Sequence, residues 1–317
     1  MNDGSGENDS QGCGRGWIPG APGIPAFVLH ASEPSAIPVL IAVPHGGRAY
    51  SRALLHDMRH PESAVLRLED RYADRLAQGV ARETGAGLLV ANAPRAMIDL
   101  NRAPDDVDWD MFAQADRPAG AVRPSSRRVR SGLGLIPRRL AGMGELWRRR
   151  MESAELARRI EGIHAPYHAT LARALADLRD RWGAALLIDL HSMPPLPARG
   201  GMPPAEVVIG DRFGAACHGR LIGAAFSQMA VLRREAAHNR PYAGGYVLER
   251  HADPRKGIHA LQIEIDRSCY LDAGLAEPGE GMAAMVEDIS TLVRRLAGVV
   301  SDMGQEQGGK GWPLAAE

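Results

Sequence analysis

Three apolar, strand-like runs of this sequence each end in side chains that can bind a metal ion or transfer a proton. These side chains are His45 after residues 38–43, Asp189 and His191 after residues 184–188, and Glu264 after residues 260–263. In an open α/β sheet the ligand site lies beyond the carboxyl ends of the strands, so we expect the three segments to converge. Two histidines and a carboxylate at one place are typical of a mononuclear metal hydrolase.

His45 and His191 are the candidate metal ligands of the two strand ends. Gly46 and Gly47 follow His45 and let the backbone turn sharply beside a ligand; the alternative is a histidine that only caps the turn. Asp189 and His191 are two residues apart in a strand, so their side chains point to the same face. We therefore expect Asp189 to orient the imidazole of His191, although a purely structural His–Asp pair has the same spacing.

A third ligand and a catalytic base must come from carboxylates elsewhere in the chain. In the predicted helix 63–84, Glu69 and Asp70 are the best acidic pair for the third ligand, and ordinary solvated helix charges are the alternative. Glu264 lies between two isoleucines, and a glutamate in an apolar strand needs a partner or a function. A general base for a water beside a metal is one such function. An ion pair with Arg267 is the structural alternative.

Short apolar runs alternate with helical patterns along the chain, which indicates an α/β protein. The expected strands are 38–43, 87–92, 184–190, 205–209 and 260–265, and the expected helices are 63–84, 144–181, 213–232 and 279–300. Residues 103–143 are rich in proline, glycine and arginine. They are expected to form a long basic loop with a solvated face, the alternative being an anion or nucleic-acid patch. Polar, glycine-rich composition predicts disordered tails over residues 1–20 and 303–317, which leaves residues 21–302 as one domain.

The composition excludes several classes of function. The 317 residues include 38 lysines plus arginines and 38 aspartates plus glutamates, so no global field favours nucleic acid or an acidic membrane. Three cysteines are too few for a disulfide framework or a cysteine zinc cluster. The sequence has neither an apolar run of about 18 residues nor a signal pattern at its start. We therefore expect a cytoplasmic protein without a membrane segment.

Linked motifs, in chain order, resemble the N-formylglutamate amidohydrolase family over residues 38–272. The motifs are Pro44-His45-Gly46-Gly47-Arg48, Glu69-Asp70-Arg71-Tyr72, Asp99-Leu100-Asn101-Arg102, Asp189-Leu190-His191-Ser192, Asn239-Arg240-Pro241-Tyr242 and Gln262-Ile263-Glu264-Ile265-Asp266-Arg267. Together they are far more specific than any one of them. The resemblance implies a single three-layer α/β domain whose mixed, mostly parallel sheet is flanked by helices. This is the zinc carboxypeptidase-like (phosphorylase/hydrolase-like) fold, which aspartoacylases share.

The resemblance also implies the residues of a zinc site. His45, Asp70 and His191 fall at the positions of the family's zinc ligands, which favours Asp70 over Glu69 and implies one Zn²⁺ per chain. Glu264 falls at the position of the proposed general base. The expected activity is hydrolysis of the amide of an N-acyl amino acid such as N-formyl-L-glutamate.

Residues for substrate binding follow from the same resemblance. Asn101 and Arg102 fall where carboxypeptidase-like enzymes hold the substrate carboxylate, a task that suits the guanidinium fork. Arg48 or Arg240 is expected to stabilise the oxyanion. Tyr242 is expected to donate a hydrogen bond from a glycine-rich loop that closes over the site, unless that loop is only a tight turn.

The expected partner is a small-molecule N-acyl amino acid, with no nucleic acid or membrane partner. One alternative is a zinc peptidase or peptidoglycan amidase, against which the missing secretion signal counts. The other is a metal-binding homologue without activity, which would be expected to lack Glu264 or Arg102, and both are present.

Overall fold

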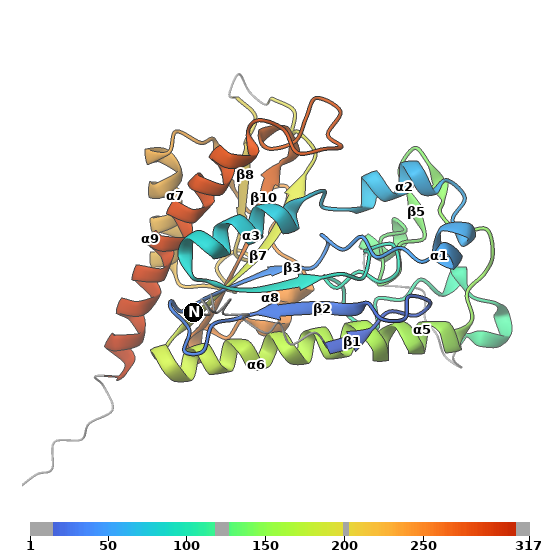
Figure 1. Cartoon of the computed structure of the whole chain (residues 1–317), viewed down its shortest axis with the longest axis horizontal. Coiled ribbons are helices and arrows are strands. Elements are labelled where there is room, and N and C mark those ends of the chain that lie inside the picture. Colours follow the sequence, from blue (N-terminus) through green and yellow to red (C-terminus); the bar gives the residue numbers. More distant parts are fainter. Residues whose placement is uncertain (1–14, 118–126, 199–202, 309–317) are drawn as a thin grey trace, which may run out of the picture.

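An eight-stranded sheet with helices on both faces forms the centre of the protein in a computed structural model of the chain (Figure 1). The structure describes residues 15–117, 127–198 and 203–308. The strand order is β1-β2-β4-β3-β7-β10-β8-β9, and neighbouring strands from β4 to β10 run parallel. Antiparallel pairs join β1 to β2, β2 to β4 and β8 to β10. The mixed, mostly parallel sheet between helices confirms the fold class predicted from the sequence.

The inner strands are buried on both faces. The strands of the sheet are β1 (Arg15–Trp17), β2 (Pro25–His30), β3 (Val39–Val43), β4 (Gly87–Ala91), β7 (Ala185–Met193), β8 (Val207–Gly210), β9 (Ala236–His238) and β10 (Ile258–Asp266). Side chains alternate between two cores, as the pleat requires. In β3, Leu40 and Ala42 join one core and Ile41 and Val43 join the other. Such continuous apolar runs are typical of strands in parallel sheets.

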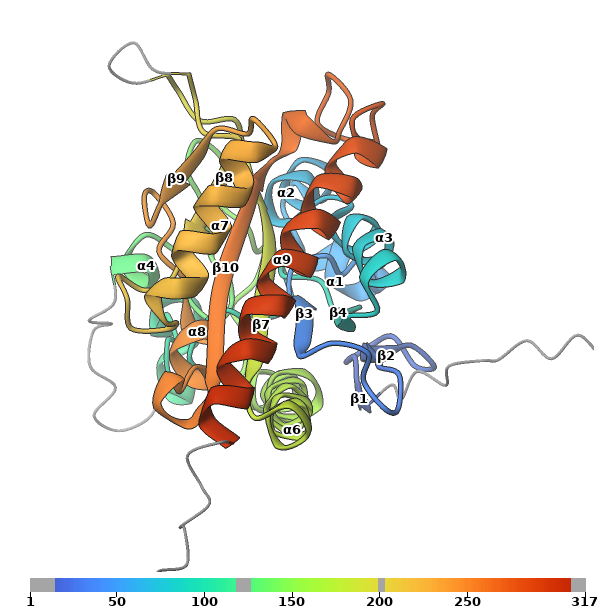
Figure 2. The same ribbon diagram turned by 90° about the vertical axis from the view of Figure 1, so that its left-hand side faces the viewer.

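Helices cover each face of the sheet. The main helices are α1 (Arg52–Asp57), α2 (Pro61–Leu68), α3 (Ala73–Thr84), α5 (Ser153–Arg159), α6 (Ala165–Trp182), α7 (Gly219–Val231), α8 (Tyr246–His251) and α9 (Met282–Gly308). Helices α3, α9 and α7 pack side by side on one face (Figure 2), and α6 packs on the other. The shorter elements α4 (Arg127–Arg130), β5 (Arg139–Leu140) and β6 (Gly144–Glu145) lie between β4 and α5.

The parallel register of the central strands brings the predicted strand ends together. Glu264 in β10 is the direct neighbour of His191 in β7, and Asp189 in β7 is the neighbour of Ala42 in β3. The carboxyl ends of β3, β7 and β10 therefore meet at one edge of the sheet.

The predicted helix 63–84 is wrong in one respect, because it is two helices. Helix α2 ends at Leu68 and α3 begins at Ala73. Glu69 is extended, with φ −73° and ψ 144°, and ends α2, while Tyr72, directly before α3, has a left-handed φ of 55°. The periodicity of the apolar residues continues across this break and conceals it.

Other predicted helices differ at their starts. The predicted helix 144–181 begins only with α5, since residues 144–145 pair in β6. The predicted helix 213–232 begins at Gly219, because Arg212 and Phe213 both have positive φ angles near 55° and form a turn. The edge strands β1 and β9 were not predicted, since each has only three residues. The neighbouring strand β2 was missed although it contains the apolar run 26–29.

The predicted tails and loop are partly ordered. Residues 15–17 of the predicted tail 1–20 form β1, and α9 continues past residue 302 to Gly308 because its apolar face continues. The predicted loop 103–143 contributes buried residues such as Phe112, Leu135 and Ile136 to the core. Residues 1–14, 118–126 and 309–317 of these predictions lie outside the described residues. None of the helices in the described ranges is long and apolar enough to cross a membrane.

Candidate metal centre

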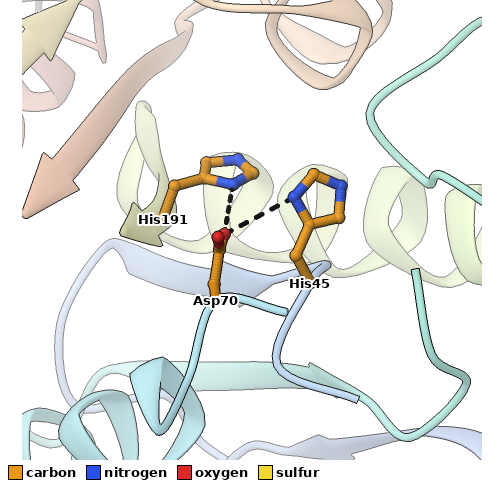
Figure 3. A group of neighbouring side chains, drawn as sticks. All are labelled: His45, Asp70 and His191. Carbon is orange, nitrogen blue, oxygen red and sulfur yellow. Dashed lines mark hydrogen bonds and ion pairs between the residues drawn. The ribbon is translucent and has the colours of Figure 1, made fainter. Parts of the chain in front are cut away.

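Three buried side chains from separate parts of the chain meet at the carboxyl edge of the sheet. His45 follows β3, Asp70 lies between α2 and α3, and His191 is in β7. Their ligand atoms all lie within 4.8 Å of one another. Asp70 Oδ2 is 2.9 Å from His191 Nδ1 and 3.5 Å from His45 Nδ1, so both imidazoles turn Nδ1 toward the same carboxylate (Figure 3).

Asp70 reaches this point because the chain leaves the helix there. Its backbone N–H donates to the carbonyl oxygen of His45 at 3.0 Å, which joins the segment after β3 to the break after α2. Arg267 holds the same break by donating to the carbonyl oxygen of Glu69. The expectation that Asp70 lies on a helix face is therefore wrong, and the interruption itself carries the carboxylate into the site.

Glu69, the alternative to Asp70, is not part of the cluster. Its carboxylate accepts a hydrogen bond of 2.9 Å from Arg71. Of the residues that the structure describes, the group able to hold a metal ion contains Asp70 together with His45 and His191. The geometry therefore favours Asp70 as the third donor.

The Nε2 atom of each imidazole faces a second carboxylate, on the side away from Asp70. His45 Nε2 is 2.7 Å from Asp99 Oδ1, and His191 Nε2 is 2.9 Å from Asp189 Oδ2. Because a carboxylate only accepts, these contacts assign a proton to each Nε2. The nitrogen of each imidazole that would bind a cation is then Nδ1, which faces Asp70. Such carboxylate–histidine pairs are characteristic of metal-bound imidazoles. Asp189 thus lies where its spacing from His191 led us to expect it.

The donor set fits a metal ion. His45 Nδ1 is buried and has no hydrogen-bond partner in the structure. Burial disfavours a charge on His191, but Asp189 and Asp70 outweigh burial and raise its pKa well above the usual range. Burial would also raise the pKa of Asp70, yet the two histidines hold it well below the usual range. A cluster that attracts positive charge and offers two nitrogens and one oxygen matches a catalytic zinc site.

Glu264 is buried at the end of β10, beside His191 in the sheet. Burial raises the pKa of its carboxyl group to about 8, although the positive charge of His191 opposes the increase. Gln262 donates to Glu264 Oε1 at 2.9 Å. Arg267, the structural alternative as its partner, instead donates to Ser192 Oγ at 3.0 Å and to backbone carbonyl groups. Glu264 therefore remains available for proton transfer.

Asp99 contacts several groups of the site. It belongs to one of the sequence motifs, but no role was predicted for it. Besides the bond to His45, it accepts hydrogen bonds from Arg95 Nε at 3.0 Å and from the backbone N–H of Asn101 at 2.9 Å. Arg102 Nη2 is 3.8 Å away. Arg95 was missed entirely, since it belongs to no motif. Burial would raise the pKa of Asp99, but Arg95 and Arg102 hold it well below the usual range.

Asn101 and Arg102 lie beside the centre, but the structure uses them differently. The Asn101 carboxamide is buried, accepts the backbone N–H of Val247 at 2.9 Å and lies 3.3 Å from His191 Nε2. Arg102 is 4% exposed and donates to the carbonyl oxygens of Leu133 and Asn101. Burial lowers the pKa of Arg102. Asn101 therefore joins the metal centre to α8, while Arg102 is held by two backbone carbonyl groups and turns Nη2 toward Asp99.

The remaining predicted residues lie at different distances from the centre. Arg48 is committed to Asp74 through two hydrogen bonds of 2.8 and 2.6 Å. Arg240 is exposed and lines a separate cavity of about 180 Å³. Tyr242 is half-buried, and burial, with Glu264 and Asp70 nearby, raises its pKa. Of these three, Tyr242 is the residue that the structure places within electrostatic reach of the centre.

One helical segment holds the loop that carries Asp99 and Arg102. Three of its side chains donate to carbonyl oxygens of residues 97–102. These bonds run from Arg159 to Met97, from His168 to Leu100 and from His164 to Arg102, at 2.8, 3.0 and 2.9 Å. His251 of α8 is 2.9 Å from His168. Burial lowers the pKa of His168 to about 2 and that of His251 to about 3, so both imidazoles are neutral.

Comparisons with known proteins agree with this geometry. A family model for N-formylglutamate amidohydrolase matches residues 37–271. The chain belongs to this family. The N-formylglutamate deformylase of Pseudomonas putida is 30% identical over 276 residues, which are 86% of this chain and 95% of the relative. The resemblance found in the motifs is confirmed.

Solved structures show the same relationship. The N-formylglutamate amidohydrolase of Ralstonia eutropha is 31% identical, with a TM-score of 0.79 over 88% of this chain and 100% of that chain. A gene product of Agrobacterium tumefaciens, 16% identical with a TM-score of 0.59 over 88% of this chain and 94% of its own, shares the fold.

Proposed function

We propose that this member of the N-formylglutamate amidohydrolase family is a zinc-dependent hydrolase of N-formyl amino acids such as N-formyl-L-glutamate. The observation that carries the proposal is the buried convergence of His45, Asp70 and His191, with both Nδ1 atoms turned toward Asp70. The names of the relatives, N-formylglutamate deformylase and amidohydrolase, support the substrate class.

His45, Asp70 and His191 would hold the ion. When bound there, zinc supplies Lewis-acid polarisation of an amide carbonyl and makes water more acidic. Asp99 and Asp189 keep the Nε2 protons in place, so the tautomer that binds a cation is present before the ion arrives.

Glu264 accepts a proton from the attacking water and returns it to the leaving nitrogen of the amide. Its carboxylate is buried, accepts only one hydrogen bond from a protein group described by the structure, and lies on the strand next to His191. A positioned carboxylate with a raised pKa is suited to both transfers, because it accepts and releases a proton near neutral pH.

Arg95 is a better candidate than Arg48 or Arg240 to face the oxyanion. Its side chain is 19% exposed and its charge interacts with Asp70 and Glu264. Arg48 is committed to Asp74, and Arg240 is exposed beside a separate cavity. A guanidinium fixed by Asp99 would stabilise developing negative charge without reorganising.

Arg102 binds the substrate's α-carboxylate in this proposal. It lies 3.8 Å from Asp99, which in turn contacts His45, and it also lines an open cavity. A substrate held at Arg102 would therefore place its amide toward the metal centre, and such positioning contributes to rate by lowering the entropic barrier.

The test is direct. The purified protein loaded with zinc should hydrolyse N-formyl-L-glutamate and contain about one zinc ion per chain. His191→Ala should lose both the zinc and the activity. His56→Ala is the matched control, because His56 has an 87% exposed side chain outside the cluster. Full zinc content and activity in His191→Ala would refute the ligand assignment.

A further inference from the structure

A cavity of about 250 Å³ opens beside Arg102 and Asn101, and Asn101 lies 3.3 Å from His191 of the metal centre. It lies between the loop after β4, the short helix α4 and the start of α8. Its charged lining residues are Arg102, Arg128, Arg212, Asp106 and Glu249. The roles given above to the metal centre leave this cavity without a function.

The charges around the cavity do not balance. Arg212 pairs with Glu249 at 3.0 Å, and Asp106 lies within electrostatic reach of Arg102. Arg128 lines the cavity with an exposed side chain, and its guanidinium has no hydrogen bond or ion pair with any residue that the structure describes. Arg102 has Asp99 and Asp106 nearby and Arg212 has Glu249, so Arg128 carries the unbalanced positive charge of the cavity.

The cavity is connected to the metal centre through Arg102. The buried side chain of Arg102 lines the cavity and also lies 3.8 Å from Asp99. Asp99 in turn contacts His45. Tyr242 lies within electrostatic reach of both regions, because Glu264 and Asp70 of the centre and Arg128 of the cavity all influence the pKa of its hydroxyl group. A bound amino acid derivative can thus extend from the centre past Arg102 into the cavity.

We propose that this cavity is the side-chain subsite of the enzyme and that Arg128 determines specificity for a second, distal carboxylate on the substrate. The inference rests on the proposed hydrolysis of N-formyl amino acids and adds to it the residue that selects acidic side chains. A carboxylate of the substrate would neutralise the unbalanced charge with a charge-assisted, bidentate contact.

The backbone supports this assignment at the opposite wall. Arg212 has a φ of 55°, a left-handed backbone conformation that is unfavourable for residues other than glycine. The following β8-to-α7 turn holds its guanidinium against α8, where it also lies 3.4 Å from the carbonyl oxygen of Gly245. Strain of this kind is typical of functional sites. Arg212 would thus form a fixed wall of the subsite that Arg128 also lines.

The experiment compares N-formyl-L-glutamate with N-formyl-L-glutamine, whose side chain has the same shape without the charge. The wild-type zinc enzyme should show a higher kcat/KM for the glutamate derivative. Arg128→Gln should lower that kcat/KM about tenfold, the low end for a charge-assisted contact because Arg128 is exposed. The glutamine derivative should change less than about threefold, and Arg128→Lys should retain part of the preference.

Arg117→Gln is the matched control, because Arg117 pairs with Asp110 and does not line the cavity. Circular dichroism and zinc content establish that each variant is folded and loaded. Equal losses for both substrates, or no loss, in Arg128→Gln would overturn the subsite. A wild type that hydrolyses both substrates equally well would overturn the subsite but leave the proposed function standing. A wild type that hydrolyses no N-formyl amino acid would overturn both.

Discussion

Replacing Asp99 by asparagine should separate metal binding from folding in this protein. The carboxylate accepts His45 Nε2–H at 2.7 Å, Arg95 Nε–H at 3.0 Å and the backbone N–H of Asn101 at 2.9 Å. Asparagine has the same shape but only one accepting oxygen. Its amide nitrogen must therefore take the place of one of the two oxygens. It then faces either the Nε–H of Arg95, so that two donors meet, or the imidazole of His45.

Both orientations of the new side chain weaken the metal site. If the amide nitrogen faces His45, the imidazole must move its proton to Nδ1, the nitrogen that would bind the ion. If the amide nitrogen faces Arg95, the imidazole keeps its tautomer but loses a charged acceptor. Loss of such a partner typically weakens metal affinity about 10- to 100-fold, or about 1.4–2.8 kcal/mol. The apo protein should also lose up to about 3–5 kcal/mol of unfolding free energy, because Arg95 and Arg102 remain near a neutral group.

Zinc affinity is measured by competition with a chelator, and stability by urea denaturation of the apo protein. The matched control is Asp74→Asn, which removes an arginine-paired carboxylate that contacts neither histidine of the centre. It should leave zinc affinity within about twofold and cost about 1 kcal/mol of stability, since its ion pair is partly exposed. A folded Asp99→Asn protein with wild-type zinc affinity would refute the orienting role of Asp99. Equal losses in both variants would show that only net charge matters.

Three further predictions follow from the same geometry. Glu264→Gln should keep fold and zinc but lower kcat by about two to four orders of magnitude; a rate within about threefold of wild type would show that another group takes the proton. Arg102→Lys should lower kcat/KM for N-formyl amino acids about 10- to 100-fold, and substrates with an amidated α-carboxylate should be poor for both enzymes; equal rates on free and amidated substrates would contradict the role of Arg102. The pKa of His168, about 2 in the folded state, lies below its unfolded value, so its contribution to stability is present above about pH 6.5 and decreases below it by about 1.4 kcal/mol per pH unit. His168→Gln should therefore show a shallower loss of stability between about pH 6.5 and 5 in urea titrations, and an unchanged slope would contradict this.

The central strands and the histidines of the centre could be predicted from sequence because two local signals coincide there. Continuous apolar runs predict strands buried on both faces, and the ends of parallel strands meet at one edge. His45 and His191 therefore required no knowledge of long-range contacts. The place of Asp189 was predicted from its two-residue spacing to His191. Glu264 was singled out because burying a charge between two isoleucines is energetically unfavourable without a partner or a function.

The features that were not predicted depend mainly on contacts between residues far apart in the chain. Asp70 was expected on a helix because periodicity does not register the left-handed turn at Tyr72. Asp99 reaches His45 only because its loop folds against the end of β3, and Arg95 joins the centre through its bond to Asp99. The predicted basic loop proved to contain core residues such as Leu135, since its apolar residues are too scattered to form a periodic pattern.

The helical segment that holds the loop of Asp99 contains one wider turn, which changes the direction in which the following side chains point. Helices α5 and α6 are joined by a π-helical turn, Ile160–His164, closed by a hydrogen bond from the N–H of Ala165 to the carbonyl oxygen of Ile160. In a regular α-helix, five residues turn the chain by about 500°, so Arg159 and His164 would point about 140° apart. The wider turn absorbs the extra residue and lets both reach the same loop.

The wide geometry of this turn therefore decides the alignment, and Gly162 supports it, because a Cβ there would lie 2.8 Å from the carbonyl oxygen of Trp17. Substitutions at Glu161, which is exposed, should be tolerated. Straightening the turn into a regular α-helix with all five residues kept would move Arg159 and His164 about 140° apart. Removing one residue from 160–163 would leave them only about 40° apart, so both could still reach the loop. The geometry of this one turn thus aligns Arg159, His164 and His168 with the loop that carries Asp99, which in turn contacts His45.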